Sequence, residues 1–307
     1  MTTAPEKLLE TEEAQNQNNP NNQDNQNNQN VEQIFPIDPR AIKKVRHKLE
    51  KPLYVIFVVL HIGVFIGVFF LNLDLSFISE GWDNTTLFGF ILIAPLIVIF
   101  MMHWYYAQTR AYAIRVSEKN FPEIYYKSVE FTKRLGLKRV PAIYVTQENG
   151  ILNAFAAAIV GRKRYAQLNA ELVDVAYMEH KDFDTVFFVL AHEFGHIYFK
   201  HVTFLYNLST CISLLVPFIE GPLSRAREYS CDRVAQLLLQ RNGVNEMMVL
   251  SAGRHLYKYV DAEDYLINAK KEKGLFLWVL NLLSTHPIMQ KRIAALADPN
   301  KRSGKLF

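Results

Sequence analysis

The chain has 307 residues, of which 50% are hydrophobic, and a formal net charge of +4. This length holds one sizeable domain plus membrane segments, and the hydrophobic fraction is high for a soluble protein. Much of the basic excess is a local patch between residues 40 and 51, so the charge requires no nucleic-acid partner. The only two cysteines, Cys211 and Cys231, form no C-x-x-C pair, so the sequence implies neither a disulfide framework nor a structural zinc site.

The first 35 residues are dominated by asparagine and glutamine. A segment with almost nothing apolar to bury stays disordered, so residues 1–35 are predicted to form a disordered tail. The tail lacks the apolar core of a cleavable signal peptide. A solvated leader is the simpler interpretation of this tail, and a tether or a binding segment is the alternative.

A basic juxtamembrane segment is predicted at residues 36–52, before two apolar runs. Its Lys and Arg residues are Arg40, Lys43, Lys44, Arg46, Lys48 and Lys51. Residues 53–105 then predict two transmembrane helices joined by a short loop at 72–86. Each run is near the length needed to cross about 30 Å of hydrocarbon. The second run contains Pro95 and continues into the aromatic pair Trp104 and Tyr105.

Charge on the flanks of these spans predicts their orientation. The loop at 72–86 has no Lys or Arg, whereas the basic segment precedes the first span and Arg110 and Arg115 follow the second. The positive-inside rule therefore places both termini and the following domain in the cytoplasm, and the short acidic loop outside. The expected location is the plasma or inner membrane, with the lipid bilayer as a partner. The basic patch is also suited to anionic lipid headgroups.

The remaining residues predict one folded domain at 106–299 and a short tail at 300–307. The pattern favours a helix over 110–138, with Pro122 at its start or at a kink. Residues 141–145 form a strand signal that ends at a turn. Residues 153–159 and 165–168 suggest a hairpin with a basic tip. Few strands and many helices predict an α+β fold that is mostly helical, with a small sheet.

An H-E-x-x-H pattern lies inside an apolar helix and carries the main chemical signal. His192 and His196, four residues apart, lie on one helical face, so that their imidazoles can meet at one Zn²⁺. Glu193 is placed to hold a water molecule and accept its proton. Acidic Asp184 in the first turn supports a helix start there. His201, five residues past His196, is predicted to point elsewhere and to be structural or exposed.

The apolar stretch that follows, residues 202–219, resembles a third span by hydropathy. A single crossing would separate residue 228 from the two histidines, and the stretch is too short to cross twice. It is therefore predicted to be a buried helix or one that lies in the membrane interface.

A candidate third metal ligand comes from the segment 224–232. A catalytic zinc takes three protein ligands and keeps one position open, and Glu228 supplies a suitable carboxylate. Asp232, one helical turn later, would accept the other ring N–H of a zinc-bound histidine. Alternatively, both acids belong to a solvated helix face beside Arg225 and Arg227. Cys231 in this helix is predicted to be a small buried filler.

Taken together, these motifs resemble the membrane zinc peptidases typified by bacterial HtpX and the CAAX prenyl proteases, over residues 105–297. The matching elements are H-E-F-G-H at 192–196, S-R-A-R-E-Y-S-C-D at 224–232, N-A-F-A at 153–156 and H-P at 286–287 followed by Arg292. One departure is that the HtpX branch carries a pair of spans between the two helices, where this chain has about thirty residues.

The resemblance implies a zincin-like metalloprotease domain of the gluzincin kind, which binds one Zn²⁺ per chain. It implies that the N-A-F-A strand is an exposed edge on which substrate backbone pairs, through Asn153, Ala154, Phe155 and Ala156. Phe155 packing in the core is the alternative. It also implies that His286 and Arg292 line the cleft, where they donate to an oxyanion or His286 occupies the open metal position. A structural role for both is equally open.

The predicted function is a membrane-anchored zinc endopeptidase that acts on polypeptides, in particular misfolded membrane proteins. Two spans with a cytoplasmic domain suit quality control better than prenyl-tail processing, which uses a large multi-span chamber. Two alternatives come from other classes: a non-catalytic zinc-containing membrane scaffold, and a module that binds unfolded chains without zinc. Glu193 favours the enzyme, because a structural zinc site does not need that acid.

Overall fold

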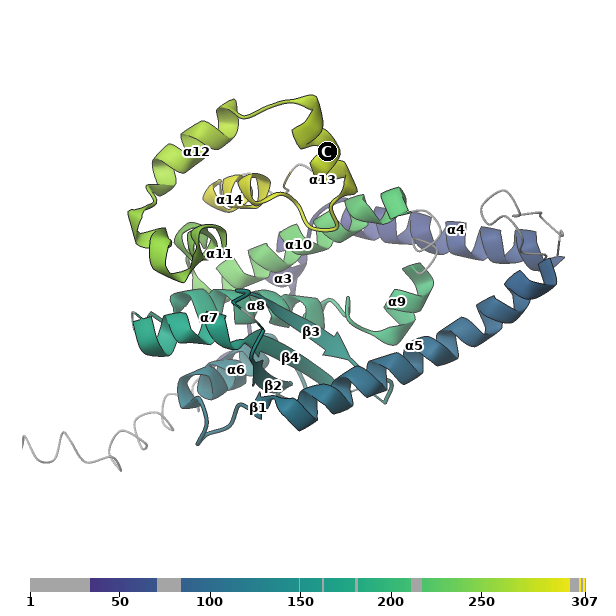
Figure 1. Ribbon diagram of the computed structural model, residues 1–307, viewed down its shortest axis with the longest axis horizontal. Helices are drawn as coiled ribbons and strands as arrows, with labels where there is room; N and C mark the ends of the chain where they lie inside the picture. The colour runs from purple at the N-terminus through teal and green to yellow at the C-terminus, as the bar shows by residue number, and fades with distance from the viewer. Residues whose placement is uncertain are drawn as a thin grey trace, which may run out of the picture.

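The computed structural model describes residues 34–70, 84–148, 150–161, 163–179, 182–210 and 217–298, together with Gly304 and Leu306. Residues 1–33 of the predicted tail, most of the loop at 72–86 and most of the tail at 300–307 lie outside the described residues. The described chain is mostly helical with one small mixed sheet (Figure 1). This observation confirms the predicted α+β class.

The sheet has four strands in the order β1-β2-β4-β3. The strands are β1 (Ile114–Arg115), β2 (Ala142–Thr146), β3 (Ala154–Ala158) and β4 (Arg164–Asn169). β2 and β4 run parallel, whereas β1 pairs with β2 and β3 pairs with β4 in antiparallel fashion. The predicted strand and the predicted hairpin are therefore present. β3 lies at one edge of the sheet, which is the position the substrate-pairing hypothesis requires.

The helix predicted over 110–138 is wrong in its first part. α5 (Asn84–Tyr112) ends before β1, and α6 (Pro122–Arg134) is a separate helix. The N–H of Val116 donates to the carbonyl of Ile143 at 2.9 Å, so this segment pairs with the sheet instead of continuing a helix. Pro122 stands at the start of α6, where a missing N–H costs nothing. Gly136, with φ +63°, takes the left-handed conformation just beyond the end of α6.

One hydrophobic core joins the sheet to the helices of the domain. Those helices are α6, α7 (Ala170–Asp174), α8 (Asp184–Tyr198), α10 (Pro217–Leu239), α11 (Val244–Leu256) and α14 (Met289–Ala297), with a π-helical turn, η1 (Val175–Glu179), after α7. α8 is buried along most of its length between the sheet and α10. Phe194 in α8 packs edge-on against Phe131 of α6, with ring centroids 5.7 Å apart. The core therefore encloses the helix that carries the H-E-x-x-H pattern.

The C-terminal part of the chain wraps over α10. It contains η3 (Tyr257–Tyr259), α12 (Ala262–Lys271) and α13 (Leu275–Leu283) before α14. Arg225, fully buried in α10, donates to the carbonyls of Leu306, Asn281 and Ser284 at 2.7 to 2.8 Å. These hydrogen bonds hold the end of α13 against α10 and thereby position the His286-Pro287 segment that follows.

Two long helices project from the domain and converge at their far ends (Figure 1). α3 (Pro39–Val45) leads into α4 (Glu50–Phe70), and α5 returns to the sheet. Among the described residues, one window, Glu50–Gly67, is long and apolar enough to cross a membrane. The second predicted span lies in α5, several of whose side chains between 84 and 94 are outside the described residues. It stays a prediction.

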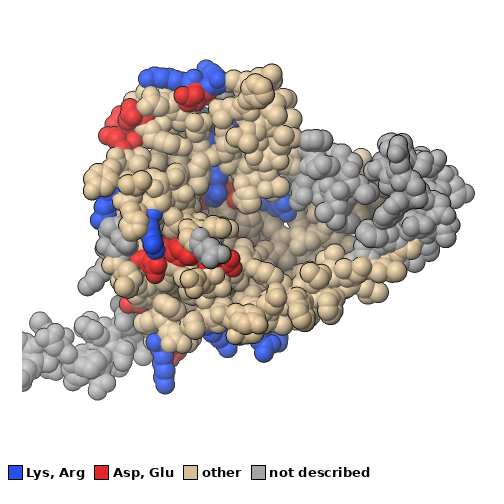
Figure 2. Space-filling model, in the orientation of Figure 1, with Lys and Arg blue, Asp and Glu red and all other residues tan. Residues whose placement is uncertain are grey.

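The described residues 52–70 of α4 and 84–109 of α5 include no Lys, Arg, Asp or Glu. Figure 2 shows α5 as an edge without Lys, Arg, Asp or Glu over most of its length, whereas charged side chains gather on the domain. Large apolar side chains of α4 are exposed, among them Val55, Ile56 and Val59, which are 52% to 61% exposed. Such a continuous apolar surface suits lipid and not water.

Only the two ends of the stretch predicted as one buried or interfacial helix lie within the described residues. α9 (Phe204–Thr210) covers its first part and α10 begins at Pro217. Residues 211–216, which include Cys211, lie outside the described residues. In α9, Tyr206 is buried and stacks on Tyr54 of α4 at 4.6 Å between ring centroids, whereas Leu205 is 75% exposed. α9 therefore packs against the base of the projecting helix.

We expect Arg225→Met to lower the free energy of unfolding by about 3 kcal/mol, because several buried carbonyls lose a charged donor. Denaturant unfolding of the detergent-solubilised chain measures this effect. Arg241→Met is the matched control: Arg241 pairs with Asp184 where both side chains are about half exposed, at 53% and 45%. Its loss should cost less than about 1 kcal/mol. Equal effects of the two substitutions would contradict the anchoring role of Arg225.

Candidate metal centre

The two histidines of the H-E-x-x-H pattern converge as their spacing predicts. His192 and His196 both project from α8, and their Nε2 atoms are 3.2 Å apart. His192 is buried, and the side chain of His196 is 16% exposed. Glu193, also buried, lies between them on the same helix and lines the adjoining cavity. The helical period alone accounts for this arrangement.

α10 brings Glu228 to the same point. Its carboxylate oxygens lie 3.4 Å from Nε2 of His192 and 3.3 Å from Nε2 of His196. One donor atom from each of the three residues lies within 4.8 Å of the others, as a shared metal ion requires. Two imidazole nitrogens and one carboxylate oxygen are a ligand set that zinc accepts in catalytic sites. The residues present therefore fit a zinc ion.

A glycine allows the two helices to approach this closely. A Cβ added to Gly195 would lie 3.1 Å from Cα of Cys231, which is tighter than ordinary van der Waals contact. A larger residue at this position would require its neighbours to shift by a few tenths of an ångström. Cys231 is buried at this crossing, in agreement with its prediction as a small filler.

Asp232 lies behind His192. Its Oδ1 is 2.8 Å from Nδ1 of His192, the contact predicted for a carboxylate that orients a metal-binding histidine. Arg292 of α14 donates to both oxygens of Asp232, at 2.6 and 3.0 Å. Its Nη1 is also 3.7 Å from Glu228. Arg292 is thus held by the carboxylates at the back of the site, although it also borders the cavity.

The electrostatics of the site favour charged carboxylates despite burial. Burial raises the pKa of Glu228, but hydrogen bonds and charge from His192 and His196 outweigh it and hold that pKa well below its usual range. Burial likewise opposes ionisation of Asp232, and Arg292 and His192 lower its pKa. Burial opposes protonation of His192, yet Asp232 and Glu228 raise its pKa to about 10. The buried carboxylates of Asp232 and Glu228 therefore stabilise the protonated form of His192, and a metal that binds His192 must displace this proton.

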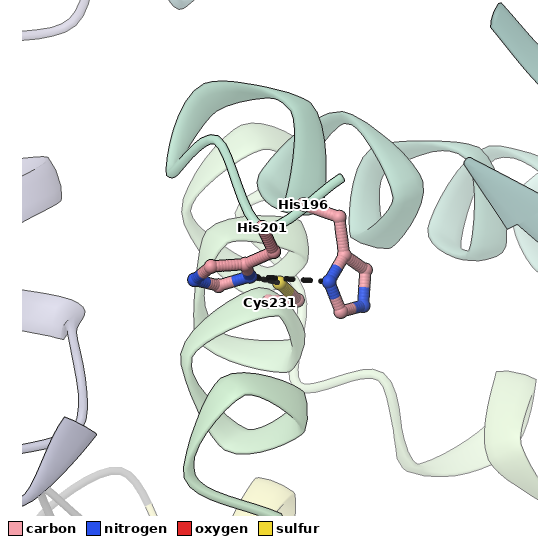
Figure 3. Close-up of side chains that lie close together, drawn as sticks. All are labelled: His196, His201 and Cys231. Atoms are coloured by element: carbon pink, nitrogen blue, oxygen red, sulfur yellow. Dashed lines mark hydrogen bonds between the residues drawn. The ribbon is translucent and has the colours of Figure 1, made fainter. Parts of the chain in front are cut away.

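His201 contradicts the prediction that it points elsewhere. Its Nδ1 lies 3.1 Å from Nδ1 of His196, and its side chain is buried (Figure 3). The prediction assumed a helix that continues through residue 201. Instead α8 ends at Tyr198, and Lys200, with φ +65°, reverses the chain so that the N–H of His201 donates to the carbonyl of His196. No pattern in the sequence indicates this left-handed residue.

His286 lies at the mouth of the site. Its Nε2 is 3.7 Å from Glu228, and its side chain is 66% exposed. It also lines a cavity of about 280 Å³ that contains His192, Glu193 and His196. β3 and the preceding residues form another wall of this cavity, from Leu152 to Ala156. The structure therefore brings all the predicted site residues except Asp232 to one cavity, and Asp232 supports it from behind.

The edge of β3 presents backbone groups to the open side of the sheet. Asn169 donates to Asn153, and Ile159 donates to Lys163, within the β3–β4 pairing. Because ladder bonds alternate along an antiparallel strand, odd-numbered residues of β3 turn their N–H and C=O toward β4. Ala154 and Ala156 accordingly turn theirs to the open edge. Phe155 packs on Tyr105 of α5 and on Tyr165 of β4, with ring centroids 5.7 and 6.2 Å away.

Comparison with models of protein families assigns this chain to a known family of proteins. The model of peptidase family M48 matches residues 118–219 and 203–300, which together exceed half of the chain. The chain belongs to peptidase family M48. A search of curated proteins and a search of solved structures each found no match. The family match confirms the resemblance drawn from the sequence motifs.

Membership of family M48 assigns the chain to the metalloproteases, which are hydrolases that depend on a metal and act on polypeptides. Both helices of the candidate metal centre, α8 and α10, lie inside the matched region. The group His192, His196 and Glu228 is able to hold the metal that such an enzyme needs.

We expect Glu228→Ala to abolish stable zinc binding, because two imidazoles alone do not hold zinc well. Asp232→Asn should lower zinc affinity by about 10- to 100-fold, since His192 loses a charged partner. Competition with a chromophoric chelator measures both. Asp174→Asn, at a partly exposed ion pair with Arg254, is the control and should bind zinc normally. Unchanged affinity in Glu228→Ala would remove it from the ligand set.

Proposed function

We propose that this M48 member is a membrane-anchored zinc endopeptidase. One observation carries the proposal: Glu193 borders the same cavity as the His192–His196–Glu228 group and the open edge of β3. A metal-binding group, a general base and a backbone edge at one cavity are the parts that peptide hydrolysis needs. A purely structural metal site needs only the first of these.

The residues divide the chemical work in a simple way. His192, His196 and Glu228 would hold the zinc, which when bound lowers the pKa of water and polarises a carbonyl group. Glu193 accepts the proton of the attacking water and delivers it to the nitrogen of the leaving amine. Asp232 fixes the ring of His192 through the contact at its Nδ1. Both proton transfers therefore pass through a single carboxylate.

Substrate would lie extended beside β3 and extend the sheet by one strand. The outward N–H and C=O of Ala154 and Ala156 would bind the peptide backbone, so that recognition depends little on side chains. His286, largely exposed at the cavity, is the better placed donor for a developing oxyanion. Arg292 is already engaged by Asp232 and Glu228. We therefore assign Arg292 the role of holding those carboxylates.

The exposed apolar surface of α4 and the basic residues before it support a membrane anchor. We expect α5 to supply the second span, and the positive-inside rule then puts the domain and both termini in the cytoplasm. Because residues of β3 line the cavity and pairing through backbone groups depends little on substrate side chains, broad specificity is expected. Misfolded membrane proteins are the substrate class we favour over prenylated tails.

The sharpest test is cleavage of an unstructured protein by the detergent-purified, zinc-loaded chain. Glu193→Gln should lower the rate by at least about a hundredfold while zinc content stays unchanged, because the general base is lost and the ligands remain. Glu130→Gln, on the surface of α6, is the matched control and should cut normally. If Glu193→Gln cuts as fast as the wild type, the assignment fails. If neither protein cuts while both hold zinc, the scaffold alternative gains.

A second variant tests the substrate edge. Ala156→Pro removes an outward N–H without removing a ladder bond to β4, and edge strands tolerate proline at such positions. We expect kcat/KM to fall about tenfold, mostly through KM, as the loss of one backbone hydrogen bond implies. Ala156→Ser keeps the N–H and should be close to wild type. Unchanged kcat/KM in the proline variant would mean that substrate does not pair with this edge.

A further inference from the structure

The first residue of the membrane helix is buried beside the metal centre. Glu50 begins α4, yet its side chain has no exposed surface. Its carboxylate contacts Nε2 of His201 at 2.8 Å, pairs with Arg46 and accepts from the hydroxyl of Ser230 in α10. A carboxylate enclosed by three donors is ionised and acts as an acceptor only.

This acceptor determines the proton positions along a chain of hydrogen bonds. His201 must donate its Nε2–H to Glu50, so the Nδ1 of neutral His201 is an acceptor. His196 then donates its Nδ1–H to that nitrogen across 3.1 Å (Figure 3). The Nε2 of His196 is left with a lone pair that faces His192 and Glu228. This is the tautomer that a metal ligand requires.

We propose that His201 and Glu50 are positioning residues for the metal ligand His196, and that they couple the metal centre to the start of α4. The inference rests on the proposed zinc site. Asp232 orients His192 through Nδ1, and the His201–Glu50 pair does the same for His196. A partner of this kind fixes the ring and raises its basicity as a ligand. The sequence motifs assign no partner to His196.

Additional contacts tie the same turn to the juxtamembrane segment. The guanidinium of Arg46 lies over the ring of Phe199, 5.0 Å from its centroid, and Phe199 stacks on His201 at 5.5 Å. Tyr206 of α9 contacts His201 on another side and stacks on Tyr54 of α4. The residues before and within the first turns of α4 therefore enclose the turn that follows the H-E-x-x-H helix. A shift of α4 relative to the domain would move His201.

The cluster in Figure 3 also contains Cys231, whose Sγ is 3.8 Å from Nδ1 of His201. His196, His201 and Cys231 lie close enough together to hold a second metal. That arrangement would require His196 to bind a metal through each ring nitrogen and so to lose its N–H. The hydrogen-bond chain satisfies each nitrogen without this cost. We call the hydrogen-bond chain from His196 through His201 to Glu50 the relay. The relay implies one metal per chain and no role for Cys231.

Zinc affinity of the full-length chain in detergent tests the relay. His201→Ala removes the acceptor for His196, and Glu50→Gln removes the charge that orients His201. Each should lower zinc affinity by about 10- to 100-fold, as measured with a competing chelator. Because His201 and Glu50 act through one hydrogen-bond chain, the variant with both substitutions should bind zinc within about threefold of the single variant that has the lower zinc affinity. His201→Asn places an amide oxygen near the former Nδ1 and should restore part of the affinity.

Controls separate positioning from general stability. Cys231→Ala should bind zinc within about threefold of the wild type. The unfolding midpoint of the metal-free chain and the visible spectrum of its Co²⁺ form are measured for each variant. A lower midpoint with unchanged zinc affinity and an unchanged Co²⁺ spectrum would overturn the inference. Two zinc ions per wild-type chain, with one in Cys231→Ala, would overturn it in favour of a second metal site.

The outcomes also distinguish this inference from the proposed function. A wild type that binds zinc but cuts no peptide contradicts the endopeptidase, while the affinities of the His201 and Glu50 variants still decide the relay. A wild type that cuts normally, with full zinc affinity in His201→Ala, contradicts only the relay. A wild type that binds no zinc contradicts both.

Discussion

The close crossing of α8 and α10 is the constraint on which the rest of the molecule depends. α8 supplies the two imidazoles and the proposed general base Glu193, and α10 supplies the carboxylate of Glu228, which completes a group able to hold a metal. Neither helix carries a complete site. Gly195 sets their separation, since a Cβ there would lie 3.1 Å from the backbone of Cys231. Because protein interiors are close-packed, this small residue contributes to the close approach by which Glu228 reaches the histidines.

The core around this crossing is unusual in holding several carboxylates. Glu50, Glu193, Glu228 and Asp232 are all buried, and an ionised carboxylate in a core is costly unless it is paired. The structure supplies Arg46 for Glu50 and Arg292 for Asp232 and Glu228. The histidines complete the compensation, and a bound cation would add to it. Metal binding and the stability of the folded domain should therefore be linked, because the ligands are brought together only by folding.

The projecting helices belong to the catalytic domain structurally and are more than a tether. Leu53 of α4 packs on a small cluster that joins α10, α14 and Leu306, the next-to-last residue. At the other side of the cavity, Tyr105 of α5 packs on Phe155 of β3. The two helices thus contact the two walls between which substrate would lie. The cavity is thereby held at a defined distance from the exposed apolar surface of α4.

The sequence alone determined the features that depend on local periodicity. The spacing of His192, Glu193 and His196 places them around one point because the helical turn is regular, and the same turn relates Glu228 to Asp232. The apolar run of α4 and the strands of the hairpin were likewise readable from residue type and spacing. These features needed no knowledge of distant contacts, and the family match over 118–300 agrees with them.

Only the tertiary structure decided which distant residues serve those motifs. His201 turns back to His196 because Lys200 adopts a left-handed backbone conformation. A lysine in the sequence does not predict that conformation. Glu50 lies 151 positions from His201, and Arg292 lies 60 positions from Asp232. Each of these contacts depends on how whole helices pack against one another. Local patterns specify which groups can bind a metal, whereas packing specifies which groups hold them in place.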